Sequence, residues 1–150
     1  MRATYIRPTR VDGVVNGLVA LSTRVGLPLA GSRVLAVRGS TSGEWRTTPV
    51  NPLHLGGDRY LVAPRGTTQW VRNLRAAGAG RLQHGRRIEE FTAVEIADAE
   101  KPPVLREYLR VWAWEVGRFF EDLDQHSPDE RLLDAASGFP VFRITTVSGD

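Results

Sequence analysis

Cysteine is absent from this sequence of 150 residues. Without thiols the chain can have neither a disulfide framework nor a thiolate metal site. The three histidines do not have a spacing typical of metal ligands, and each is expected in a surface turn or loop: His54, His84 and His126. The sequence therefore predicts that no metal is bound.

Long apolar runs are also missing. The most apolar stretch, residues 11–30, is interrupted by polar side chains and is too polar for a transmembrane helix. The N-terminus lacks the charged start and apolar core of a signal peptide. With 41% hydrophobic and 25% charged residues, the chain is typical of a globular protein that buries its own core. We expect one cytoplasmic domain, residues 1–150, with residues 1–11 as a flexible lead-in.

Lysine is nearly absent: Lys101 is the only lysine, and the other 19 of the 20 Lys and Arg residues are arginines. The net charge is +3. Arginine offers a planar fork that suits phosphate and carboxylate groups. A nucleic-acid-binding protein would concentrate its arginines on one face among exposed aromatic side chains. Here they are spread along the whole chain. We therefore expect no nucleic-acid partner, and we expect most of the arginines to be solvated.

Motifs of hydrolytic and nucleotide-dependent enzymes are missing as well. The sequence has no G-x-S-x-G, no H-E-x-x-H, no Walker loop and no G-x-G-x-x-G. Its carboxylates lie in patterns that are typical of solvated helix faces, as at Glu121, Asp122 and Asp124. No pair of acidic and basic residues stands out as a catalytic pair.

Hydrophobic periodicity and turn residues predict alternating groups of strands and helices. Strands are expected at residues 33–38, 44–55 (interrupted by Pro49 and Pro52), 60–63, 81–83, 87–96 and 140–147. Helices are expected at residues 14–25, from Thr67 or Thr68 to 77, at 104–120, and from a Ser127 cap to near Gly138. Tight hairpins between strands imply antiparallel pairing. The predicted class is α+β, a split antiparallel β-barrel of about six strands with flanking helices.

The stretch from Val34 to Arg75 carries most of the recognisable chemistry. Strand-like runs flank the loop Gly39–Gly43, which consists of glycine, serine and threonine. Backbone N–H groups in such a loop can converge on a phosphate, and hydroxyl groups add donors. Arg46 lies on the strand that follows, and Arg65 precedes a helix whose N-terminus favours anions. The stretch predicts a site for an extended anionic ligand, although such turns are also common without any ligand.

The order of several short motifs resembles the deazaflavin-dependent nitroreductase family. These motifs are G-x-x-S-G-x-x-R-T-T-P-V from Gly39, Y-L-V-A from Tyr60, W-x-x-N-L-x-A from Trp70, and a hairpin with Gly85 and Arg86. The ordered set is more specific than any one motif. The resemblance implies a split β-barrel oxidoreductase, of a kind found mainly in actinobacteria, that uses reduced coenzyme F420, an 8-hydroxy-5-deazaflavin.

The resemblance also implies roles for individual residues. The phosphodiester and acidic tail of the coenzyme would be held by Ser40, Thr41, Ser42, Gly43 and Arg46. The deazaflavin ring and the ribityl chain would contact Thr48, Pro49, Val50, Ala63, Pro64, Arg65, Gly66, Trp70 and Asn73. Family members commonly have basic residues where this chain has Ser40 and Thr41, so the tail would depend on Arg46, Arg65 and Arg38.

The implied reaction is hydride transfer from the reduced coenzyme to a small electron-poor acceptor such as a quinone, an enone or a nitroaromatic. The acceptor would lie near Tyr108, Trp112 and Phe119, and Tyr108 is a candidate proton donor. Their helical spacing, however, favours core packing over a substrate wall.

Several alternatives stay open. The barrel could be a non-catalytic coenzyme- or anion-binding protein, or a relative that uses FMN or haem. It could be a monomer or a homodimer. The helix at residues 14–25 could touch a membrane, but burial against the barrel is favoured.

Overall fold

The computed structural model describes residues 33–116, 120 and 122–147. The expected lead-in (1–11), the expected helix at 14–25 and Phe119 lie outside these residues. The strands are β1 (Arg33–Arg38), β2 (Trp45–Val50), β3 (Leu53–Leu55), β4 (Asp58–Val62), β5 (Ala79–His84), β6 (Arg87–Glu95) and β7 (Val141–Thr146). The α-helices are α2 (Gln69–Ala77), α3 (Lys101–Val116) and α4 (Asp129–Ala135), and short 3-10 helices span Asp98–Glu100 and Ala136–Gly138.

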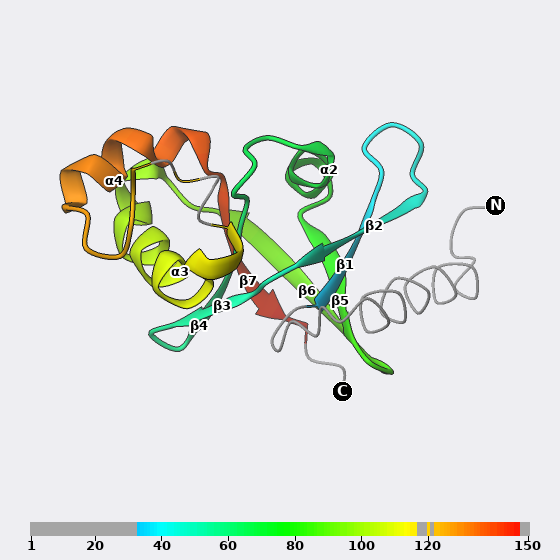
Figure 1. Cartoon of the computed structure of the whole chain (residues 1–150). Helices are drawn as coiled ribbons and strands as arrows, with labels where there is room; N and C mark the ends of the chain where they lie inside the picture. The colour runs from blue at the N-terminus through cyan, green and yellow to red at the C-terminus, as the bar shows by residue number, and fades with distance from the viewer. Residues whose placement is uncertain (1–32, 117–119, 121, 148–150) are drawn as a thin grey trace.

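The strands form one antiparallel sheet in the order β2-β1-β5-β6-β7-β4-β3. Its two edges, β2 and β3, follow each other in the sequence and are separated only by Asn51 and Pro52. The sheet is therefore curled so that one interrupted strand connects both edges, which makes a split barrel (Figure 1). The predicted interruption at Pro52 is confirmed, but the one at Pro49 is wrong: Pro49 lies within β2, paired with Val34, because β2 is an edge strand and proline is tolerated there. The prediction of about six strands counted this interrupted strand once.

Two predicted turn signals are confirmed. Gly56 and Gly57 connect β3 to β4 with φ values of 60° and 85°, a region that glycine adopts without strain. Gly78 ends α2 with φ 69° and donates its N–H to the Leu74 carbonyl at 2.8 Å.

Two predicted helix starts need correction. The α3 helix begins at Lys101, earlier than the predicted Val104, because prolines are tolerated in a first helical turn. The predicted Ser127 cap is wrong. The Ser127 hydroxyl accepts a hydrogen bond from the Asp124 amide at 2.9 Å, and Pro128 precedes α4 without any side-chain cap.

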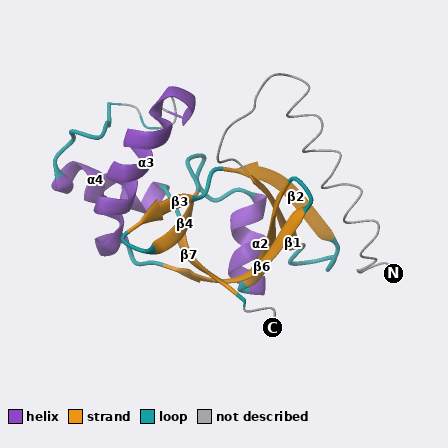
Figure 2. Ribbon diagram, turned by 90° about the horizontal axis from the view of Figure 1, so that it is seen from below, coloured by secondary structure: helices purple, strands orange, loops and turns teal. Residues whose placement is uncertain are grey.

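The sheet has a hydrophobic cluster on each face. The inner cluster joins the barrel interior to α2 through Leu35, Val37, Leu61, Ala63, Val71, Leu74, Leu82, Phe91, Phe142 and Ile144. The outer cluster packs α3 and α4 against β3, β4 and β7, and it includes Leu105, Tyr108, Leu109, Trp112, Phe120 and Leu132. Figures 1 and 2 both show α3 and α4 together on one side of the molecule and α2 apart from them, nearer β1 and β2.

An ion pair connects β4 to β6. Arg59 donates hydrogen bonds to both oxygens of the Glu89 carboxylate, and the Thr146 hydroxyl also contacts that carboxylate. The hydrogen bonds from Arg59 are the main reason that the pKa of Glu89 is lowered from 4.5. A lowered folded-state pKa stabilises the protein at pH values above the unfolded pKa, and this stabilisation is lost as the pH falls through the folded pKa.

We expect Glu89→Gln to lower the free energy of unfolding by about 1 kcal/mol at pH 7, a small amount because the pair is partly solvated. Below pH 4.5 the difference from the unsubstituted protein should shrink, since protonated Glu89 loses the same interaction. Urea unfolding at pH 7 and at pH 3 measures both differences. Equal differences at the two pH values would contradict this account.

Candidate functional site

A cavity of about 510 Å³ lies between α2, β2, the corner after β4, and α3. Its lining residues are Val37, Arg46, Thr47, Thr48, Pro49, Val50, Asn51, Val62, Pro64, Arg65, Thr68, Gln69, Trp70, Asn73 and Tyr108. We call this cavity the α2 pocket. It brings together residues as far apart in the sequence as Val37 and Tyr108.

Asn73 connects the α2 pocket to the loop Gly39–Gly43. Its side chain is fully buried, and its Oδ1 accepts hydrogen bonds from the Ser40 amide at 3.0 Å and from Gln69 Nε2 at 2.9 Å. Because one buried oxygen accepts both bonds, the Ser40 amide and the Gln69 side chain are held in a fixed geometry around it. Asn73 therefore fixes the loop relative to α2.

The loop itself is held by internal hydrogen bonds. The Gly39 amide donates to the Glu44 carbonyl at 2.6 Å, and the Gly43 amide donates to the Gly39 carbonyl at 2.9 Å. The Glu44 amide donates to Ser42 Oγ at 3.1 Å. With the Ser40 amide bound to Asn73, most of the N–H groups that were expected to converge on a phosphate already have partners. What the loop still offers a ligand is chiefly its exposed hydroxyl groups.

Arg38 braces this loop. Its Nη1 donates to the Gly43 carbonyl at 2.9 Å, and its guanidinium lies 4.7 Å from the centre of the Trp45 ring. A cation over an indole face is attracted by the ring quadrupole. Arg38 does not line the α2 pocket. In this structure its side chain contacts the loop and Trp45, and its expected contact with the coenzyme tail stays a prediction.

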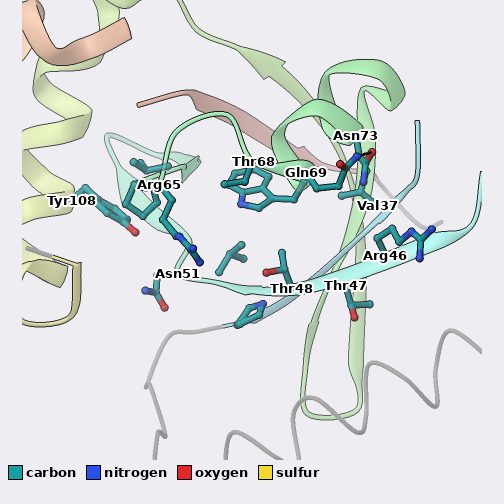
Figure 3. Close-up of a pocket in the computed structure, with 15 residues that line it drawn as sticks. Val37, Arg46, Thr47, Thr48, Asn51, Arg65, Thr68, Gln69, Asn73 and Tyr108 are labelled. Carbon is teal, nitrogen blue, oxygen red and sulfur yellow. Dashed lines mark hydrogen bonds between the residues drawn. The ribbon is translucent and has the colours of Figure 1, made fainter. Parts of the chain in front are cut away.

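Two other arginines lie at opposite ends of the α2 pocket. Arg46, on β2, is at the end next to Gln69 and Asn73, whereas Arg65 is at the end next to Asn51 and Tyr108 (Figure 3). The exposed Arg46 side chain passes beside Gly39, where a Cβ atom would lie 3.7 Å from its Nε. Within the described residues Arg46 forms no ion pair. Its charge is thus available to a ligand.

The wall between the two arginines is mostly apolar. It is made of Val37, Pro49, Val50, Val62, Pro64 and Trp70. Trp70 also packs on the inner core, with its ring centre 6.0 Å from that of Phe142. Strand pairing places Arg46 directly opposite Val37, so the charged end and the apolar wall are in fixed register. An elongated ligand with a flat apolar part and an anionic end suits this arrangement.

Tyr108 belongs both to the core and to the pocket. Only 2% of it is exposed, it packs against Phe120 in the outer cluster, and its hydroxyl points toward the pocket in Figure 3. Trp112 is buried in the same cluster but does not line the pocket, which agrees with the core role that its spacing favoured.

The structure gathers most of the predicted coenzyme residues, but not all of them. Those that line the α2 pocket are Arg46, Thr48, Pro49, Val50, Pro64, Arg65, Trp70 and Asn73. Those that do not line it are Ser40, Thr41, Ser42, Gly43, Ala63 and Gly66. Ala63 is buried in the inner core. The pocket is also lined by residues to which the resemblance assigns no role, namely Val37, Thr47, Asn51, Val62, Thr68 and Gln69. The alternation of β1 could have indicated Val37, whereas no sequence signal indicated Thr68 or Gln69.

Two buried polar atoms in the pocket have no hydrogen-bond partner among the described residues. They are Asn73 Nδ2 and Thr68 Oγ1. Thr68 precedes α2 without making a side-chain cap, so its hydroxyl has no structural use there. Buried polar groups are nearly always paired, and an orphaned one needs an explanation. Both atoms could bind a ligand that carries hydrogen-bonding groups along one edge.

Other kinds of site find no support in the described part of the chain. It contains no group of three or more histidine, aspartate or glutamate side chains that could hold a metal ion. None of its helices is both long enough and apolar enough to cross a membrane.

Comparison with known proteins identifies relatives. A profile of the F420H(2)-dependent quinone reductase family matches residues 14–117. The structure of the F420-H2 dependent reductase FDR-A aligns with a TM-score of 0.52 and 19% identity, over 77% of this chain and 94% of its own. A proposed pyridoxamine 5′-phosphate oxidase from Listeria innocua aligns with a TM-score of 0.50 and 13% identity, over 92% and 94% of the two chains. No curated protein matches the sequence significantly. At such identities the structural likeness shows a shared fold.

Proposed function

The chain belongs to the F420H(2)-dependent quinone reductase family and is an F420-dependent reductase, and we propose that its α2 pocket holds the coenzyme for reduction of a quinone. One observation carries this assignment of the site. The cavity is elongated, with an arginine at each end, an apolar wall between them, and two buried polar atoms without partners. A coenzyme with a flat ring and an acidic tail has the complementary features.

Arg46 and the loop would bind the acidic end of the coenzyme. The Arg46 guanidinium can make charge-assisted hydrogen bonds to a phosphate or a carboxylate, and the exposed hydroxyls of Ser40 and Thr41 lie on the adjoining loop. Asn73 would hold the loop in place through Ser40, and its free Nδ2 would donate to an acceptor on the coenzyme. The acidic tail would thus be recognised by one cation and several neutral donors.

The apolar wall would orient the ring and exclude water. When bound, reduced F420 supplies a hydride. Two-electron reduction of a quinone also takes up a proton. The Tyr108 hydroxyl is an O–H donor at the pocket surface, held in place because the ring is buried, so Tyr108 is the candidate that would hold this proton. Arg65, at the same end, would stabilise negative charge on the acceptor oxygen.

The assignment is tested with purified protein in two steps. A fluorescence titration should show saturable binding of F420 and little binding of FMN. Reduced F420 should then be oxidised in the presence of menadione, with absorbance at the coenzyme maximum as the readout. Tight F420 binding without turnover of a quinone, an enone or a nitroaromatic would favour the alternative, a non-catalytic coenzyme-binding protein. Absence of F420 binding would contradict the assignment of the α2 pocket as the coenzyme site.

Thr68→Val offers a sharper test of the coenzyme position. The substitution keeps the shape of the side chain and removes a buried hydroxyl that makes no hydrogen bond within the described protein. We expect F420 affinity to fall by about 0.5–1.5 kcal/mol, the net value of one hydrogen bond, while the melting temperature stays the same or rises. Thr67→Val is the matched control, because Thr67 is exposed and does not line the pocket. Unchanged affinity in Thr68→Val would place the polar edge of the coenzyme elsewhere.

A further inference from the structure

A second cavity, of about 750 Å³, opens at the end of the barrel away from α2. The β5 strand begins at Ala79, directly after α2, and runs away from that helix to His84. The cavity lies at this far end and is lined by Arg33, His54, Arg59, Leu82, His84, Arg87, Ile88, Glu89, Glu90, Thr146 and Val147. We call it the barrel mouth. It shares no lining residue with the α2 pocket.

Strand register shows that most of these side chains point into the barrel. Residues paired across an antiparallel ladder project from the same face of the sheet. Leu82, an inner-core residue, is paired with Glu89, and His84 is paired with Arg87 two residues further along. In the same way, Arg59 is paired with the inner-core residue Ile144. The inner face therefore changes from apolar to polar and basic at the mouth.

The two carboxylates of the barrel mouth already have cationic partners. Glu89 is bound by Arg59, and Glu90 lies 3.5 Å from Arg81, which is not part of the lining. Arg87, by contrast, forms no ion pair with any described residue. Arg33 contributes another guanidinium to the lining, and His54 and His84 contribute ring N–H donors. The electrostatic field in the mouth therefore favours an anion.

Apolar surface lies beside these donors. Leu82 lines the cavity from the inner face, whereas Ile88, which is paired with Gln83, projects from the opposite face and is 43% exposed; Val147, also in the lining, is 45% exposed. Large apolar side chains at this exposure in the same cavity as the Arg87 guanidinium suit a molecule that has both an anionic and an apolar part. A fully hydrated inorganic anion would leave that apolar surface in water.

We propose that the barrel mouth is a second binding site, which takes a small amphipathic molecule with one phosphate or carboxylate group. Arg87 binds the anionic group through its guanidinium fork, His54 and His84 add hydrogen bonds from ring N–H groups, and the apolar part lies against Leu82, Ile88 and Val147. This site is independent of the coenzyme site, because the two cavities are lined by different residues.

Isothermal titration calorimetry of the full chain with octyl phosphate tests the proposal, with octyl glucoside as the uncharged ligand of equal chain length. We expect saturable binding of octyl phosphate and at least about tenfold weaker binding of octyl glucoside, because a charge-assisted contact is lost. Saturating F420 should leave the octyl phosphate affinity unchanged. Displacement by F420, or equal affinity for the two octyl compounds, would overturn the proposal, as would the absence of saturable binding.

A pair of arginine variants locates the anionic group. Arg87→Gln should weaken octyl phosphate binding about tenfold or more, whereas Arg86→Gln should change it less than about twofold. Arg86 is the adjacent turn residue, carries the same charge and does not line the mouth. Both side chains are exposed, so both variants should fold, which circular dichroism can verify. Equal weakening in the two variants would show general attraction to a basic surface and would contradict a built site.

Discussion

Arg46→Ala is expected to weaken F420 binding by about 1.5–3 kcal/mol, which corresponds to about a 10- to 150-fold increase in Kd. Arg46 lies on β2, opposite Val37 of β1, and lines the end of the pocket nearest the loop. It forms no ion pair within the described part of the chain. Its removal should therefore affect the ligand and not the fold. The KM for reduced F420 should rise while kcat changes little, since tail binding contributes equally to the ground state and the transition state.

Fluorescence titration measures this loss of affinity, and thermal unfolding verifies that the variant is folded. Arg86→Ala is the matched control, because it removes the same charge from an exposed turn residue that lines neither cavity. Arg46→Lys should fall between the two, since lysine keeps the charge but loses the planar fork. If Arg46→Ala bound F420 as tightly as the unsubstituted protein, the acidic tail would have to lie at the other end of the pocket, near Arg65.

Phe91→Ala is expected to lower the free energy of unfolding by about 3–5 kcal/mol, the usual cost of truncating a buried phenylalanine. The Phe91 side chain is fully buried in the inner cluster. It lies opposite Gly80 on β5, where a Cβ atom would be only 3.0 Å from the ring. Because Gly80 has no side chain, the Phe91 ring fills that space alone, and its loss would leave a cavity that no neighbour can fill.

Val94 on the same strand provides the control. It is 58% exposed, so Val94→Ala should change the free energy of unfolding by less than about 0.5 kcal/mol. Should Phe91→Ala fail to fold, Phe91→Leu keeps most of the volume and should cost about 1 kcal/mol. Urea unfolding measures all three variants. A cost below about 1 kcal/mol for Phe91→Ala would mean that the inner cluster does not support the barrel.

The β6 strand shows how far a sequence pattern can be taken. The alternation of its residues predicts two faces, with Ile88 and Val94 on one and Phe91 on the other. Each face carries both apolar and charged residues, so the pattern could not tell which face is buried. The structure buries Phe91 and exposes Ile88 and Val94. The decision depends on the neighbouring strands, because burial requires apolar partners that come from other parts of the chain.

Some features of the candidate site can likewise be predicted from the sequence, whereas others depend on the tertiary structure. Gly78, Gly56 and Gly57 mark turns, and Pro52 marks an interruption, because each acts through its own backbone. The ordered motifs indicated the family, and the resemblance implied eight of the residues that line the α2 pocket. Thr68 and Gln69 were missed, since their importance comes from what α2 faces and not from any local preference.

The sequence by itself therefore determined the antiparallel strands, the hairpins, the helices of the described region and the F420-linked family, because these follow from local backbone preference and from short ordered motifs. Only the tertiary structure decided that Asn73 binds the Ser40 amide, that Arg38 braces the loop while Arg46 stays available, and that basic side chains gather at the barrel mouth. Those outcomes depend on strand register and on the curl of the sheet. Register and curl bring together residues that are distant in the sequence, and no local propensity encodes that proximity.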